Sequence, residues 1–200
     1  MISLPLWLDL FATAVFAASG ALAAAQQRQT FVTFCFFALI TGVGGGTVRD
    51  LLIGVPVFWV HDWRVPVICI GAALAIWFTP VRWWQGRALD WFDAAGLATY
   101  AVFGAAKTLG LGINPVSAIL MGAITSCIGG IIRDVLAGTP SIIMRPEIYV
   151  SAAALASGLF VALVALGLPI AVAGLAGVVA GFGLRAMAIA RGWAIPPYQN

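Results

Sequence analysis

A small set of charged side chains lies inside otherwise apolar stretches of this 200-residue sequence. Charges within a membrane-spanning segment are costly, pair with one another or line a watery cavity, and by default mark a functional site. Each of these side chains is therefore a candidate functional residue. The set comprises Asp9, Arg49, Asp50, Asp93, Lys107, Arg133 and Asp134.

Glycine runs stand shortly before both Arg-Asp pairs. The runs are Gly44, Gly45 and Gly46 in the first segment and Gly129 and Gly130 in the second, with Thr41 and Thr125 in matching places. Glycine costs about 1 kcal/mol per residue against alanine in a helix, which predicts a break whose freed carbonyls line a polar path and favour a cation. These seven residues are the predicted pore and hinge. The alternative is that glycine permits close helix packing, as small residues do in membranes.

The two segments belong to a longer internal repeat. Residues 40–56 align with residues 124–140 at an offset of 84 and share nine identities, including both glycine pairs and both Arg-Asp pairs. The same offset pairs Asp9 with Asp93. One shift therefore relates the first third of the chain to the middle of the chain.

The elements that must position these residues are membrane-spanning helices. Hydrophobic residues make up 62% of the chain and charged residues 8%, whereas soluble domains carry about 25% charged residues. At about 20 residues per crossing, we expect spans at 4–27, 29–48, 65–81, 91–110 and 115–137, and two more within 148–184, which Gly167 and Pro169 divide.

The expected fold is an all-α integral membrane protein with seven transmembrane helices. Because each repeat holds three spans, an odd number, the second copy enters the membrane the other way up. The units are residues 1–84, residues 85–168, and residues 169–200 with the seventh helix and a tail. Little chain is left for a soluble catalytic domain, and no nucleotide-binding loop, nucleophile elbow or zinc motif is present in the sequence, so we expect neither an enzyme nor a bound cofactor.

Inversion places the charges in two layers. One layer holds Asp9, Arg49, Asp50 and Lys107, and the other holds Asp93, Arg133, Asp134 and Arg185, so that each sums to zero formal charge. Neighbours such as Arg49 and Asp50 point about 100° apart on a helix, so we expect partners on other helices, with Lys107 near Asp50 or Asp9. The alternative role of these charges is structural pairing that fixes helix packing.

The loop charges predict an orientation. With the N-terminus outside, the cytoplasmic loops and tail hold Arg28, Arg82, Arg87, Arg145, Arg185 and Arg191, and the outer loops hold little beyond Arg64. Cytoplasmic loops are the ones enriched in basic residues. The basic residues are scattered singly, which does not favour nucleic acid as a partner.

At the doubled pattern GGxxRDxLxGxP, the sequence resembles the prokaryotic branch of the trimeric intracellular cation (TRIC) channel family, also catalogued as a glycine transporter family. The resemblance covers residues 4 to about 190. It implies a homotrimer in the inner membrane, one pore per subunit lined by the second and fifth spans, and passage of potassium and sodium, chiefly potassium, with no resident metal. A lysine on the fourth span of animal members is linked to voltage sensing, which makes Lys107 the candidate here.

Three classes of function stay open on the sequence. A cation channel is the first hypothesis, and a secondary transporter for glycine or another small solute is the second, because one membrane fold can serve both. The third is an assembly protein that transports nothing. The chain has no TVGYG-like carbonyl filter, so we expect only modest preference for potassium over sodium.

Overall fold

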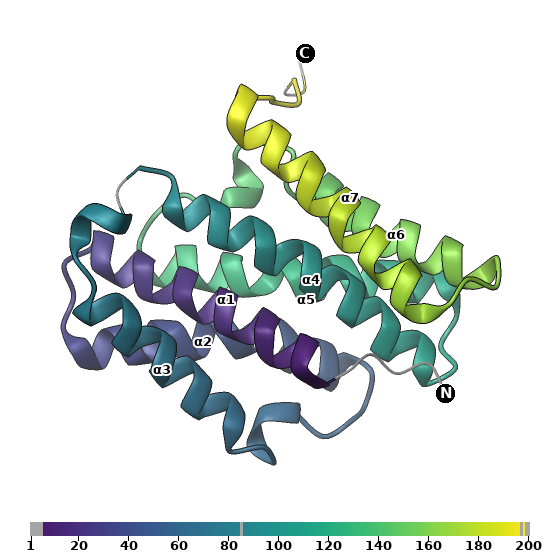
Figure 1. Cartoon of the computed structure of the whole chain (residues 1–200), viewed down its shortest axis with the longest axis horizontal. Coiled ribbons are helices and arrows are strands. Elements are labelled where there is room, and N and C mark those ends of the chain that lie inside the picture. Colours follow the sequence, from purple (N-terminus) through teal and green to yellow (C-terminus); the bar gives the residue numbers. More distant parts are fainter. Residues whose placement is uncertain (1–5, 85, 197, 199–200) are drawn as a thin grey trace.

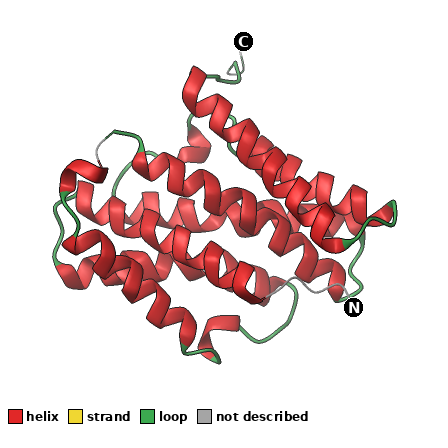
Figure 2. Cartoon of the chain, in the orientation of Figure 1, coloured by secondary structure: helices red, strands yellow, loops and turns green. Residues whose placement is uncertain are grey.

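A computed structural model describes residues 6–84, 86–196 and 198, and all regular elements in those ranges are helical (Figures 1 and 2). Three short 3₁₀ helices are η1 (Phe58–Val60), η2 (Val81–Trp84) and η3 (Ile142–Met144). The long helices are α1 (Leu6–Gln26), α2 (Phe31–Leu52), α3 (Arg64–Phe78), α4 (Ala88–Gly110), α5 (Pro115–Leu136), α6 (Val150–Ala165) and α7 (Ile170–Arg191). The expected seven-helix membrane fold is confirmed.

The helices differ in how well they match a bilayer. By length and composition, α1, α2, α5 and α7 could each cross a membrane, whereas α3 and α6 are apolar but shorter, with 15 and 16 residues. The 23-residue α4 is long enough, and it carries Asp93 and Lys107. A short helix spans by local thinning of the bilayer or by help from flanking residues, so the third helix of each repeat is the one that departs from the ideal length.

Local chemistry explains where α2 and α5 begin. The side-chain oxygen of Thr30 accepts a hydrogen bond from the Thr33 backbone N–H at 3.4 Å, and that of Asn114 accepts one from Ser117 at 2.9 Å. These are N-caps, which satisfy a backbone donor that a helix start leaves unpaired. Thr30 and Asn114 are also related by the offset of 84, so the repeat extends to the helix boundaries.

The expected break in the glycine runs is wrong. The structure shows α2 continuing without interruption through Gly45 and α5 through Gly129. A methyl group on Gly45 would collide with the backbone carbonyl oxygen of Thr125, and one on Gly129 would lie 2.7 Å from that of Thr41. The glycines therefore let the two helices cross with their backbones in contact, as small residues do where membrane helices meet.

The packing repeats as the sequence does. In the first half α1, α2 and α3 pack against one another, and α4, α5 and α6 make the same three contacts in the second. The halves meet where α2 packs on α5 and α1 on α4, while α7 covers α4 and α6 (Figure 1). The charged residues of α2 and α5 thus lie inside the bundle and not on its lipid-facing surface.

Candidate functional site

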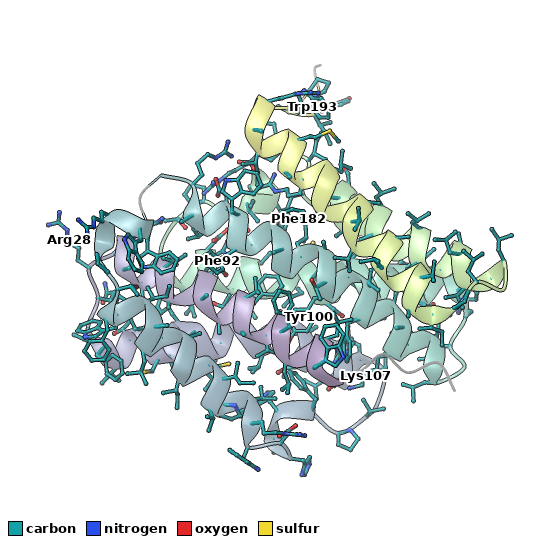
Figure 3. All side chains as sticks on the ribbon, viewed as in Figure 1. Arg28, Phe92, Tyr100, Lys107, Phe182 and Trp193 are labelled. Carbon is teal, nitrogen blue, oxygen red and sulfur yellow. The ribbon has the colours of Figure 1, made fainter. Side chains whose placement is uncertain are left out.

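The first charged network is centred on the buried carboxylate of Asp50. Its Oδ1 accepts hydrogen bonds from Arg49 Nε at 2.8 Å and from Lys107 Nζ at 2.7 Å, and its Oδ2 accepts one from the Phe58 backbone N–H at 3.0 Å. Arg49 and Asp50 are fully buried, whereas 28% of the Lys107 side chain is exposed. Lys107 lies on α4 with Tyr100 (Figure 3). We call Arg49, Asp50 and Lys107 the first network, together with Asp9, the repeat equivalent of Asp93, for which no hydrogen bond is found among the described residues.

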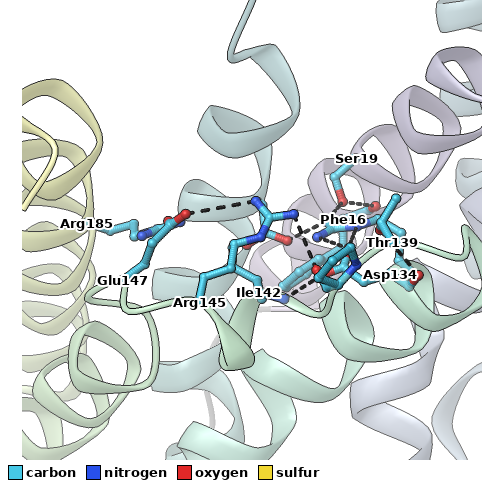
Figure 4. Close-up of polar contacts among 11 residues, drawn as sticks. Phe16, Ser19, Asp134, Thr139, Ile142, Arg145, Glu147 and Arg185 are labelled. Carbon is cyan, nitrogen blue, oxygen red and sulfur yellow. Dashed lines mark hydrogen bonds and ion pairs between the residues drawn. The ribbon is translucent and has the colours of Figure 1, made fainter. Parts of the chain in front are cut away.

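The second network uses the equivalent residues of the other repeat (Figure 4). The guanidinium of Arg133 donates to Asp93 Oδ1 at 2.5 Å through Nη1 and to Asp134 Oδ1 through Nε and Nη2 at 2.9 and 2.8 Å. Its Nη1 also reaches Ser19 Oγ at 3.1 Å, and Asp134 Oδ2 accepts the Ile142 backbone N–H at 2.8 Å. We call Asp93, Arg133 and Asp134 the second network.

The expectation that adjacent Arg and Asp residues do not pair is wrong in both networks. Arg49 Nε reaches Asp50, and Arg133 reaches Asp134, although each pair occupies successive helix positions. The arginine side chain is long enough to fold across the 100° between neighbouring positions and offer its Nε edge. One of the two expected cross-helix partners is found, because Lys107 binds Asp50. No hydrogen bond or ion pair of Asp9 is found among the described residues.

Arg185 does not join the second network. Its Nη2 donates to Glu147 Oε2 at 2.6 Å, and its guanidinium lies over the Tyr149 ring at 5.3 Å. The expected neutrality of that layer is therefore wrong: two carboxylates and one guanidinium give the second network a formal charge of −1. The first network, with two acids and two bases, stays neutral.

The offset of 84 exposes a difference between the networks. Phe58 corresponds to Ile142, so the backbone contact to the second carboxylate oxygen is shared, but Ser19 corresponds to Phe103. Arg49 accordingly lies 5.7 Å from the Phe58 ring centre and 5.4 Å from that of Phe103.

Among the described residues, neither Nη atom of Arg49 has a hydrogen-bond partner, and Asp9 Oδ1 has none either. In the second network Nε, Nη1 and Nη2 of Arg133 are all bonded, and among the described atoms only Asp93 Oδ2 is buried without a partner. Unpaired buried polar atoms are costly, so the first network is held more loosely than the second.

The glycine crossing lies in the same bundle as both networks. Thr41 and Thr125, predicted as pore residues, lie at this crossing, where Thr125 Oγ1 donates to the Met121 carbonyl at 2.6 Å and the hydroxyl of Thr41 has no partner within the described chain. The Tyr100 hydroxyl donates to the Gly42 carbonyl at 3.1 Å and contacts Thr13 Oγ1 at 2.5 Å. Polar groups therefore continue from α1 and α4 into the apolar middle of the bundle.

A cavity of about 100 Å³ reaches the second network. Arg133 and Asp134 line it together with the polar or charged side chains of Gln26, Gln27, Asp90, Thr139 and Arg145 and with apolar neighbours. The cavity therefore borders a buried carboxylate, that of Asp134. In the part of the chain that the structure describes, no group of three or more His, Cys, Asp or Glu side chains could hold a metal ion.

Sequence reasoning missed several residues of these networks. Phe58, Ile142, Ser19 and Phe103 have no charge, and Glu147 lies in a loop. The repeat could have identified two of them, because Phe58 lies eight residues after Asp50 and Ile142 lies eight residues after Asp134.

The class that this fold and these networks define is a seven-helix membrane protein with ion-pairing residues inside its bundle. A family model described as "Glycine transporter" matches residues 6–80 and 90–165. An inner membrane protein of Escherichia coli, YadS, is 41% identical over 152 residues, which are 73% of this chain and 72% of the relative. A Vibrio cholerae membrane protein is 40% identical over 152 residues, and the match spans 72% of this chain but only 62% of that relative.

A solved structure agrees over more of the chain. The TRIC trimeric intracellular cation channel orthologue from Rhodobacter sphaeroides has a TM-score of 0.87 and 41% identity, with 94% of this chain and 97% of that chain covered. The chain therefore belongs to the family of multi-pass membrane proteins that the glycine transporter model describes and that includes the prokaryotic TRIC channels.

Proposed function

We propose that this chain forms a monovalent cation channel in a prokaryotic inner membrane, conducting chiefly potassium. The path in each subunit runs along α2 and α5, past the two networks, and three subunits assemble into a homotrimer. One observation carries the cation preference: the second network has a formal charge of −1, and its Asp134 lines a polar cavity together with Asp90, Arg133 and Arg145. The Rhodobacter relative, described as a trimeric cation channel, supports the same conclusion.

The glycine crossing is the proposed constriction. Because Gly45 and Gly129 bring the α2 and α5 backbones into contact, ions pass only when the two helices slide or separate. Carboxylates at the networks then replace part of the hydration shell of the ion. No dedicated carbonyl filter is proposed, which accounts for modest selectivity.

The first network is the proposed moving part. Its arginine has unpaired nitrogens, and Lys107 is partly exposed at the last turn of α4. An ion pair with one partly exposed partner can be broken and solvated by water at a lower free-energy cost than a fully buried ion pair. Lys107 is therefore the candidate voltage sensor, and breaking its bond to Asp50 frees the carboxylate for a passing cation.

The proposed orientation follows the loop charges, with the N-terminus outside and the C-terminus in the cytoplasm. The second network then lies on the cytoplasmic side and the first on the outer side. Residues 1–84 and 85–168 are proposed as the inverted units, with residues 169–200 added. The matching contacts of α1–α3 and α4–α6 support that division.

A secondary transporter for glycine or another small solute is the second candidate. The observation that favours it is the inverted repeat, which is common in transporters that alternate between two open sides. The family description also names glycine.

Current measurements separate these functions. The purified full-length protein is placed in planar bilayers with potassium on one side and sodium on the other. Stepwise single-channel current with a reversal potential modestly favouring potassium supports the channel. Glycine uptake into vesicles without such steps supports the transporter, and the absence of both supports an assembly role.

A further inference from the structure

A second cavity lies between the ends of α1 and α3 and the start of α2. It shares Gln26 with the cavity that reaches the second network, but no residue of either network is among the described residues that line it. Its volume is about 350 Å³, within the range of small-ligand sites. The floor is made of the buried side chains of Leu22, Phe34 and Ile76, and the indoles of Trp77 and Trp84 form its walls.

The aromatic walls are held by contacts within the protein. The Trp77 ring meets Phe34 edge-on with their centres 4.9 Å apart, and the Trp84 ring lies 5.7 Å from that of Phe92. Trp84 Nε1 donates to Thr79 Oγ1 at 2.6 Å, so the indole nitrogen is already satisfied. The walls therefore present apolar surface to a bound ligand.

The mouth of the cavity is polar and cationic. Gln26, Arg28 and Gln29 line it, and none of the residues described around the cavity is acidic. Arg28 is exposed at the edge of the bundle (Figure 3). An apolar interior under a single positive charge is complementary to an anionic group that carries a hydrocarbon tail.

The backbone of Arg28 gives independent evidence that this side chain has a role. Arg28 follows α1 in the left-handed conformation, with φ at 52°, and no other non-glycine residue in the described ranges has a positive φ. The Arg28 N–H bonds to the Ala25 carbonyl and the Gln29 N–H to the Ala24 carbonyl. That pair of bonds is a Schellman motif, whose left-handed position usually holds glycine.

The same motif ends α2, α5 and α6, and there the left-handed residue is glycine: Gly54, Gly138 and Gly167. Within the described ranges, it is only at the mouth of this cavity that an arginine takes the strained position. The equivalent positions avoid this backbone strain by using glycine, so the strain at Arg28 motivates a functional hypothesis for that residue.

We infer that this cavity binds an anionic phospholipid, with one acyl chain between Trp77 and Trp84 and the phosphate on Arg28. The cavity opens where helices end and tryptophans gather, which is the level of lipid headgroups. Basic pockets between membrane helices bind anionic headgroups there. A lipid is also the anionic amphiphile that is present at this level in excess.

Thermal unfolding of the intact, purified protein in detergent tests this inference. Dioleoyl phosphatidylglycerol raises the melting temperature of the wild type by several degrees more than dioleoyl phosphatidylcholine does, because a ligand of the folded state stabilises it. Arg28→Gln abolishes that difference and Arg28→Lys retains it. Soluble glycerol phosphate has no effect, since it lacks the tail.

Two further variants keep the test decisive. Arg28→Gly melts higher than the wild type without lipid, because glycine relieves the strain, yet it loses the phosphatidylglycerol effect. Arg191→Gln, the matched control at another exposed helix end, retains the effect. The inference is overturned if wild type responds equally to both lipids, if the difference survives in Arg28→Gln, or if Arg191→Gln loses it as well.

Discussion

Asparagine substitution at Asp93 and at Asp9 compares equivalent positions with different environments. Asp93 accepts a 2.5 Å hydrogen bond from the buried Arg133, whereas Asp9 Oδ1 has no partner among the described residues. Breaking a buried ion pair by changing one partner costs about 3–5 kcal/mol. Asparagine still offers an oxygen and Asp134 still holds Arg133, so we expect a loss of about 3 kcal/mol for Asp93→Asn. For Asp9→Asn we expect less than about 1 kcal/mol, as no hydrogen bond to Oδ1 is lost.

Reversible unfolding of both variants by a denaturing detergent measures this difference. The matched chemistry makes each variant the control for the other. Asp9→Asn also leaves the first network with a formal charge of +1, so we expect well-folded protein with reduced cation conductance. Equal stability losses for the two variants would refute the inference that the networks differ in rigidity. A greater loss for Asp9→Asn would show that the first network is the rigid one.

Three further predictions concern gating, the crossing and assembly. Lys107→Gln should flatten the voltage dependence of open probability, and Lys107→Arg should preserve most of it. The reason is that moving one charge across half of a 100 mV potential changes the free energy by roughly 1 kcal/mol. Superimposable curves of open probability against voltage would exclude the sensor role. The double variant Gly45→Ala, Gly129→Ala should push α2 and α5 apart and alter conductance, with a loss of folding stability of about 1–3 kcal/mol per substitution. The control Gly183→Ala, which has open space around it, should do neither. Light scattering corrected for detergent should give a trimer, and a monomer or dimer would contradict that assembly.

The sequence determined the architecture because its signals are periodic and long. Uncharged stretches near 20 residues define spans whatever they pack against, since a bilayer demands them. The offset of 84 identified the repeat. The inverted layers that follow from it put Lys107 near Asp50 or Asp9, and the structure shows the bond to Asp50. These features depend on the chain and its solvent and not on side-chain geometry.

The tertiary structure decided what the glycines and charges do. A run of glycine is compatible with a broken helix and with a tight crossing, and only the approach of the Thr125 carbonyl to Gly45 selects the crossing. The pairing of Arg49 with Asp50 depends on a side-chain rotamer, and the departure of Arg185 to Glu147 depends on a loop that carries no periodic signal. The two networks differ because Arg133 contacts the hydroxyl of Ser19, whereas Arg49 contacts the ring of Phe103 at the equivalent position. The sequence alone does not show that either residue packs against an arginine.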